Sequence, residues 1–274
     1  MKQEILQKAL KNPFCDARFT KTEEGKTLLL LFAPYRTEKS APREGFVRIS
    51  AFYPAAQQAY LSASALVLEL SGLAARLYHR HGLKKLAASS FGFQGKNTLF
   101  YHPVHGSFVA MQGIELDVPI EADEPACENR CIDCGACAKV CPVGAFPPDG
   151  FQKESCIRYH FGKPEIPPEY GRHLYQIMGC ERCQDSCPAN QHLPEIESTV
   201  HEYDLIEVLE EKHTKEIKTL IGANFGTRTR ILNQAIYYAA NKRYLPALPA
   251  IKALLGDEQA GAAARYAAVR LDNR

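Results

Sequence analysis

Cysteine residues carry the most specific chemical pattern in this chain of 274 residues. The segment from Cys131 to Pro142 reads CIDCGACAKVCP. This is the spacing CxxCxxCxxxCP of two-cluster iron–sulfur proteins, in which the first three cysteines bind one [4Fe-4S] cluster and the fourth binds the other. A cuboidal cluster needs four thiolates that converge from different directions, and two tight CxxC turns supply three of them.

A second segment, GCERCQDSCP from Gly179 to Pro188, repeats the ending of this pattern but lacks its leading cysteine. Cys156 can fill that position. The exchange of fourth ligands in two-cluster ferredoxins then predicts two [4Fe-4S] clusters. Cluster one is assigned to Cys131, Cys134, Cys137 and Cys187. Cluster two is assigned to Cys141, Cys156, Cys180 and Cys183.

Structural zinc is the alternative, because CxxC pairs also suit tetrahedral Zn²⁺. It explains less, since zinc sites do not call for CxxCxxC followed by Cys-Pro. Two cysteines are left over. The role of Cys127 stays open: it could be a spare ligand, a redox-active thiol or an ordinary cysteine near a cluster. Cys15 is expected to be a plain buried residue.

The composition predicts a soluble, cytoplasmic protein. Residues Met1 to Asn12 have no apolar core of signal-peptide length and are expected to form a short amphipathic helix. The most apolar stretches are too short or too interrupted to cross a membrane. In a reducing compartment, clustered cysteines bind metal or do redox chemistry rather than form disulfides. The formal net charge of +2 is too small to indicate a nucleic-acid partner by itself.

The residues before the cysteine segment have the pattern of an α/β (α+β) domain. Strands are predicted at Leu28 to Phe32, Phe46 to Phe52, Thr98 to Tyr101 and Ser107 to Met111, the last two around a turn at His102 to Gly106. A helix is predicted from Ala55 to about Arg80, with Pro54 in its first turn. This domain is expected over residues 1–125.

Two further domains are predicted. Residues 126–192 form a ferredoxin-like two-cluster domain, because this stretch is rich in cysteine and proline and has little apolar periodicity. Residues 193–274 return to helical periodicity. Their last part, from Tyr244 to Leu271, has the small-residue pattern of a HEAT-like helix pair.

Two further motifs accompany the cysteine pattern: the turn FGFQGKNTL, which begins at Phe91, and the strand HGSFV, which begins at His105. Together they resemble the epoxyqueuosine reductase family, the corrinoid iron–sulfur enzymes of queuosine biosynthesis. The segment CIRY from Cys156 and the ending CPAN from Cys187 are also similar to that family. The likeness covers roughly Leu86 to Gln191 well and the tail loosely.

This resemblance implies a cobalamin held against the α/β domain, beside Lys96 and Asn97, with one cluster close enough to reduce it. The reduced cobalt would remove the epoxide oxygen of a tRNA nucleoside. The family's general acid precedes the Gly-Lys-Asn-Thr turn by about nineteen positions, where this sequence has Arg76. A guanidinium is a poor proton donor. We therefore predict a divergent, shortened member with a different substrate. Without the resemblance, the Lys96 and Asn97 turn would be interpreted as structural.

Other groups could donate a proton near a bound substrate. Tyr101, His102 and His105 are the candidates, with histidine best suited near neutral pH. Residues of these types are more often ordinary parts of a strand end or turn, and Asp117 is expected to be a plain loop acid. The sequence has neither a GxGxxG motif nor a phosphate-binding P-loop. Electrons are therefore expected from an external donor protein.

The C-terminal stretch from Ile217 to Arg274 carries nine basic residues against three acidic ones. Such a surface could bind tRNA phosphates, with Tyr237, Tyr238 and Tyr244 available for stacking. An ordinary solvated helical face is the alternative.

The leading hypothesis is an iron–sulfur oxidoreductase that passes electrons through two [4Fe-4S] clusters to a corrinoid and an unknown substrate. The first alternative is a ferredoxin-like electron-transfer protein without corrinoid. The second is a non-catalytic RNA-binding or scaffold protein with structural clusters.

Overall fold

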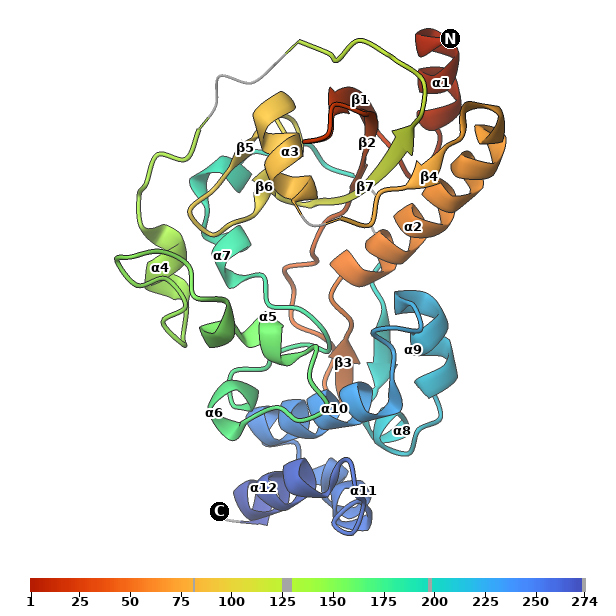
Figure 1. The fold of residues 1–274 in the computed structure, drawn as a ribbon. Coiled ribbons are helices and arrows are strands. Elements are labelled where there is room, and N and C mark those ends of the chain that lie inside the picture. The colour runs from red at the N-terminus through yellow and green to blue at the C-terminus, as the bar shows by residue number, and fades with distance from the viewer. Residues whose placement is uncertain (81, 125–129, 197–198, 273–274) are drawn as a thin grey trace. The chain divides into compact units, whose positions relative to one another are not determined.

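The computed structural model describes residues 1–80, 82–124, 130–196 and 199–272 (Figure 1). Cys127 lies outside these residues. The chain packs as two compact units, and each unit combines three separate segments. Unit 1 consists of Met1–Arg36, Ala55–Lys139 and Cys183–Glu197. Unit 2 consists of Thr37–Pro54, Val140–Arg182 and Ser198–Arg274. The division into three consecutive domains, over residues 1–125, 126–192 and 193–274, stays a prediction from the sequence. In the described part of the chain, no helix has the length and apolar character that spanning a membrane requires.

Unit 1 is built on a four-stranded antiparallel sheet with the order β1-β2-β7-β4. Its strands are β1 (Asp16–Lys21), β2 (Thr27–Pro34), β7 (Val109–Leu116) and β4 (Arg76–Leu77). The strands predicted around Leu28 and Ser107 correspond to β2 and β7. Leu28 to Phe32 are all buried, because β2 lies inside the sheet and both of its faces are covered. β1 was not predicted.

Three helices accompany this sheet: α1 (Lys2–Ala9), α2 (Phe52–Glu69) and α3 (Leu83–Ser90). α3 packs Ala87 against Leu28, Leu30 and Phe32 of β2. The helix predicted to reach Arg80 was too long. α2 ends at Glu69, a 3-10 turn follows at Ser71–Leu73, and the chain then forms β4. Gly72 weakens the helix there, and the backbone of Arg76 instead pairs with Glu115 of β7.

A small hairpin and a tight turn connect α3 to β7. The hairpin pairs β5 (Phe93–Gln94) with β6 (Phe100–Tyr101), so the strand predicted from Thr98 is shorter than expected. The backbone N–H of Thr98 donates to the carbonyl of Gly95 at 2.8 Å. The predicted turn is confirmed, because His102 and Gly106 exchange backbone hydrogen bonds of 2.8 and 2.9 Å.

The cysteine segments contain only short helices, as their low apolar periodicity predicts. These helices are α4 (Ala136–Val140), α5 (Ile157–His160), α6 (Pro168–Gly171) and α7 (Arg182–Asp185). Two 3-10 turns, Lys153–Ser155 and Pro188–Asn190, lie among them. Among the residues that the structure describes, no cysteine forms a disulfide.

Unit 2 is mainly helical. A short β3 (Phe46–Arg48) pairs with β8 (Glu202–Asp204), and the predicted strand to Phe52 is shorter because Phe52 begins α2. The helices that follow are α8 (Leu205–Leu209), α9 (Thr214–Ile221), α10 (Arg228–Lys242), α11 (Leu248–Ala253) and α12 (Gly261–Asp272), with a 3-10 turn at Leu245–Ala247. Residues 231–240 of α10 are all buried, so this helix is the centre of the unit 2 core.

The burial of α10 contradicts one expectation about the tail. Tyr237 and Tyr238 are buried, and their hydroxyls donate to the carbonyls of Ile166 and Phe46 at 2.9 and 3.0 Å. They are therefore not available to stack on bases, and Tyr244 packs against the same core. The prediction failed because helical periodicity does not tell a surface aromatic from one in a helix that is buried on all sides.

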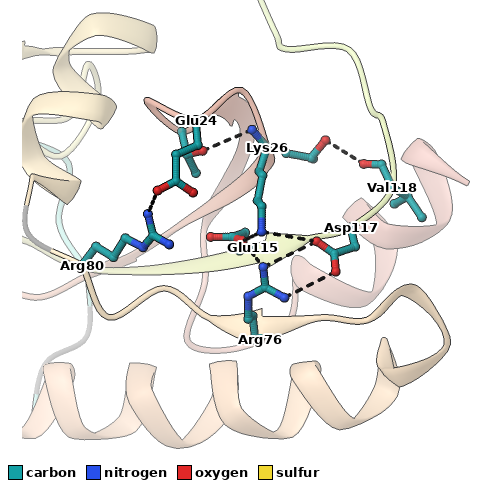
Figure 2. Close-up of polar contacts among 9 residues, drawn as sticks. Glu24, Lys26, Arg76, Arg80, Glu115, Asp117 and Val118 are labelled. Carbon is teal, nitrogen blue, oxygen red and sulfur yellow. Dashed lines mark hydrogen bonds and ion pairs between the residues drawn. The ribbon is translucent and has the colours of Figure 1, made fainter.

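Ion pairs connect β4, β7 and the turn between β1 and β2 in the unit 1 sheet (Figure 2). The buried carboxylate of Glu115 accepts from Arg76 and lies 3.1 Å from the ammonium of Lys26. Arg76 also pairs with Asp117 at 3.4 Å. Burial alone would raise the pKa of Glu115, but the hydrogen bonds from Lys26 and Arg76 outweigh it and hold that pKa below its usual 4.5.

The lowered pKa of Glu115 makes the stability of unit 1 depend on pH. A carboxylate with a depressed folded-state pKa contributes stability that is complete above its unfolded value and is lost as the pH falls through its folded value. We expect the free energy of unfolding to fall between pH 6 and pH 3, and to fall less steeply in Glu115→Gln. Urea unfolding at several pH values measures this. Asp117→Asn, at an exposed position, is the control, and identical pH profiles for Glu115→Gln and wild type would contradict the assignment.

Candidate iron–sulfur and ligand site

A cavity of about 270 Å³ lies in unit 1, between the Gly95 to Asn97 turn and the first cysteine segment. Its lining includes Lys96, Asn97, Tyr101 and His102. It also includes the thiol-bearing residues Cys131, Cys134, Cys137 and Cys187. Thus the predicted ligands of cluster one and the two residues predicted to hold a cofactor line the same cavity.

Cys187 lies about fifty residues beyond Cys137 in the sequence, yet both line this cavity. Within the described residues, no three Cys, His, Asp or Glu side chains converge closely enough to hold a single metal ion. The thiolates of a four-iron cluster each bind a different iron and stand farther apart than the ligands of one ion. The cavity therefore brings together thiols from both cysteine segments.

Hydrogen bonds fix the Cys187 segment to the rest of unit 1. The backbone N–H of Ser107 donates to Oδ1 of Asn190 at 2.9 Å. Nδ2 of Asn190 donates to Oγ of Ser107 and to the carbonyl of Gln184, both at 2.8 Å. A Cβ at Gly106, where φ is +56°, would stand 2.1 Å from Oδ1 of Asn190. This contact requires glycine in the turn.

Gln184 adds a second anchor on the other side of Cys187. Its buried Nε2 donates to the carbonyl of Ser107 at 3.1 Å and to the hydroxyl of Tyr35 at 3.2 Å. Sequence reasoning missed Gln184, Ser107 and Asn190 as functional residues, although Ser107 and Asn190 belong to the quoted motifs HGSFV and CPAN. Each is a common polar residue whose partner lies about eighty positions away along the chain.

Asn97 and Tyr101 form a buried pair in the cavity wall. Nδ2 of Asn97 donates to the Tyr101 hydroxyl at 2.9 Å, and Tyr101 stacks on Phe93 with ring centroids 4.7 Å apart. Burial, followed by a hydrogen bond to Cys187, raises the pKa of Tyr101 far above its usual value. Tyr101 therefore keeps its proton at neutral pH and presents a neutral hydroxyl to a predicted cluster ligand.

Lys96 lies at the same cavity as a paired charge. Its ammonium is 2.6 Å from the carboxylate of Asp133, which lies between two cysteines of the first segment. The hydrogen bond with Asp133 is the main cause that raises the pKa of Lys96, and the nearby Cys137 and Cys131 add to it. Lys96 is therefore a cation at neutral pH, suited to holding an amide or an anionic group.

The two histidine candidates differ in position. His102 lines the cavity, but its Nδ1 accepts from the backbone N–H groups of Val104 and His105 at 3.1 and 3.3 Å. The proton of neutral His102 is therefore on Nε2, which faces Asp16 at 3.4 Å. His105 is not among the residues that line the cavity, and burial lowers its pKa to about 4. The Nδ1 atom of His102 is thus used by the turn, and His105 lies away from the cavity lining.

Three residues discussed from the sequence lie outside the cavity lining. Arg76 and Asp117 do not line the cavity and are held in the ion pairs of Figure 2. Cys15 is exposed, contrary to the expectation of a buried residue. Its sulfur, however, is partly buried and donates to the carbonyl of Phe32 at 3.4 Å, and this partial burial raises the pKa of Cys15 to about 11. It is therefore not an activated thiol.

Three of the predicted ligands of cluster two belong to unit 2: Cys141, Cys156 and Cys180. The Cys141 sulfur accepts from the backbone N–H of Ala145 at 3.4 Å. The Cys180 sulfur accepts from Nη1 of Arg182 at 3.6 Å. Backbone and guanidinium donors around sulfur are typical of iron–sulfur sites. The fourth predicted ligand, Cys183, follows in α7.

Comparison with known proteins bears on these segments. Residues 130–190 match the family model of the 4Fe-4S double cluster binding domain. An epoxyqueuosine reductase of Listeria monocytogenes is 32% identical over 106 residues, which are 38% of this chain and 28% of that protein. One of Leadbetterella byssophila is 36% identical over 105 residues, 37% of this chain and 34% of that protein. The aligned part spans only about a third of these curated relatives.

Solved structures show the same fold over nearly the whole chain. A crystal structure of a selenomethionine-labelled epoxyqueuosine reductase has a TM-score of 0.79 at 19% identity and covers 98% of this chain and 90% of its own. The enzyme of Streptococcus thermophilus has a TM-score of 0.81 at 18% identity, covering 100% and 91%. The predicted double-cluster segment and the mixed helix and sheet fold are therefore confirmed.

Proposed function

We propose that this chain is an iron–sulfur reductase that acts on a substrate at the unit 1 cavity. Its fold, which is similar to that of solved epoxyqueuosine reductases, and its match to the double cluster binding domain support this proposal. The observation that carries this proposal is the shared lining of that cavity. Cys131, Cys137 and Cys187 line it together with Lys96 and Asn97. A ligand bound there would lie beside the cluster from which it receives electrons.

The proposed ligand sets are those of the cysteine spacing. Cluster one is held by Cys131, Cys134, Cys137 and Cys187. Cluster two is held by Cys141, Cys156, Cys180 and Cys183. The clusters would supply one-electron reduction, and an external donor protein would reload them, because the sequence has no nicotinamide or flavin motif. The HEAT-like character of α11 and α12 and the domain boundaries at 125 and 192 are part of the same proposal.

A corrinoid is the proposed second cofactor. It would supply a cobalt centre that is strongly reducing once electrons reach it. Lys96 and Asn97 would hold it, Lys96 as a cation and Asn97 through its amide. A cavity of about 270 Å³ is at the low end for small-molecule sites, so it would receive one part of so large a ring system.

The substrate is proposed only by class. One solved epoxyqueuosine reductase was crystallised with an epoxyqueuosine-modified tRNA stem loop, and its structure matches this chain with a TM-score of 0.79 at 18% identity. A tRNA nucleoside or a related electrophile is accordingly the substrate class that we propose. The proton donor would differ from the family's acid, because Arg76 is an ion-paired guanidinium outside the cavity.

Metal analysis after anaerobic purification tests this proposal. We expect about eight irons per chain and, after incubation with cobalamin and gel filtration, about one cobalt. Lys96→Ala is expected to retain the iron and to lose cobalt at least severalfold. Lys85→Ala, outside the cavity lining, is the matched control. Iron without retained cobalt would favour the ferredoxin-like alternative, and zinc in place of iron would contradict the proposal altogether.

A further inference from the structure

Arg182 is a charged side chain that directly contacts a proposed cluster ligand in unit 2. Its Nη1 donates to the sulfur of Cys180 at 3.6 Å. Its Nη2 donates to the carbonyl of His173 at 3.0 Å, and its guanidinium lies over the ring of Tyr175 at 4.5 Å. These two anchors hold the guanidinium against the sulfur.

The charge of Arg182 is not neutralised by a carboxylate within the described residues. The acid next to it in sequence, Glu181, is buried and accepts from the hydroxyl of Ser50 at 2.7 Å. The cation beside the first cysteine segment is different, because the ammonium of Lys96 is paired with Asp133 at 2.6 Å. Tyr101, the other group that contacts a ligand there, is a neutral hydroxyl. The two cysteine sets therefore have different electrostatic surroundings.

Such a difference changes reduction potentials. A [4Fe-4S] cluster with four thiolates is already anionic and gains a further negative charge on reduction, with no bond made or broken. A fixed cation that donates to a ligand sulfur stabilises the reduced form more than the oxidised form. We infer that Arg182 raises the potential of cluster two, so that this cluster accepts the first electron. This inference rests on the proposed ligand sets.

A redox titration with dithionite, followed by EPR, tests the inference on the whole protein. The wild type is expected to show two midpoints, the higher one from cluster two. Cys187→Ser, which removes a ligand of cluster one, assigns them, because the higher midpoint should be the one that remains. Arg182→Gln keeps a donor but removes the charge. The higher midpoint should therefore fall, by at least a tenfold change in the reduction equilibrium, which is about 59 mV for one electron.

Two variants separate tuning from a structural role. Arg182→Lys keeps the charge and should leave the higher midpoint close to that of the wild type. Arg172→Gln removes an exposed neighbouring cation that donates to His173 and, among the described residues, to no cysteine sulfur, and it should change neither midpoint. Unchanged midpoints in Arg182→Gln with full iron would overturn the inference. Loss of cluster two in both Arg182 variants would also overturn it, since Arg182 would then act in assembly. A wild type without four-iron clusters would instead refute the proposed function.

Discussion

Cys187→Ser is expected to purify with about four irons instead of about eight. A serine hydroxyl is a much weaker ligand than a thiolate, and the other three cysteines at the unit 1 cavity cannot complete a four-iron site alone. Iron and sulfide analysis, together with EPR of the reduced protein, measures this loss. The remaining signal should be that of one intact cluster.

The exchanged ligation makes a sharper test possible. Cys183→Ser should also lose about half of the iron, although it lies only four residues from Cys187. If the two cysteines serve different clusters, the double variant should lose nearly all of it. A double variant that still holds about four irons would place both cysteines on the same cluster. Cys15→Ser, outside both sets, is the control and should keep all the iron.

Asn190→Ala is expected to lower the free energy of unfolding of unit 1 by about 2 to 3 kcal/mol. The substitution removes three hydrogen bonds that join the Cys187 segment to Ser107 and Gln184, and it leaves partly buried groups without partners. Cluster one should also lose its iron to a chelator several times faster. Urea unfolding and the rate of iron release measure the two effects.

Gln191→Ala provides the matched control, because Gln191 is exposed and adjacent to Asn190. It should change neither the unfolding midpoint nor the rate of iron release. If Asn190→Ala behaved in the same way, the Asn190 contacts would not be what holds Cys187 at the cavity.

Local patterns in the sequence predicted the parts of this molecule that depend on spacing. The double-cluster segment follows from CxxCxxCxxxCP, and β2 follows from an unbroken run of leucines. β1 was missed because DARFTK mixes charged and apolar residues, and its place is set by pairing with β2 in a register where Phe19 faces Leu29. Propensity over six residues contains no information about that partner.

The errors in the candidate site have the same origin. Arg76 was expected in a long helix, and a partner strand about forty residues later determines its actual conformation. Tyr237 and Tyr238 were interpreted as surface aromatics, because the sequence does not show that α10 is enclosed by its neighbours. The anchors Ser107 and Asn190 are likewise recognisable only once the fold brings them together. The cluster ligands could be predicted because residue type and spacing identify them. The residues that anchor them could not, because their partners are far away in the sequence.

The interleaved segments of unit 1 have a consequence for biosynthesis. Cys137 leaves the ribosome about fifty residues before Cys187, which at typical rates of translation is an interval of about 3 to 10 s. During that time three thiols of the proposed set exist without the fourth, and Asn190 has not yet been added to anchor it. Iron delivery to this set is therefore a late event for the nascent chain, and oxidants in the cell would meet an incomplete thiol set first.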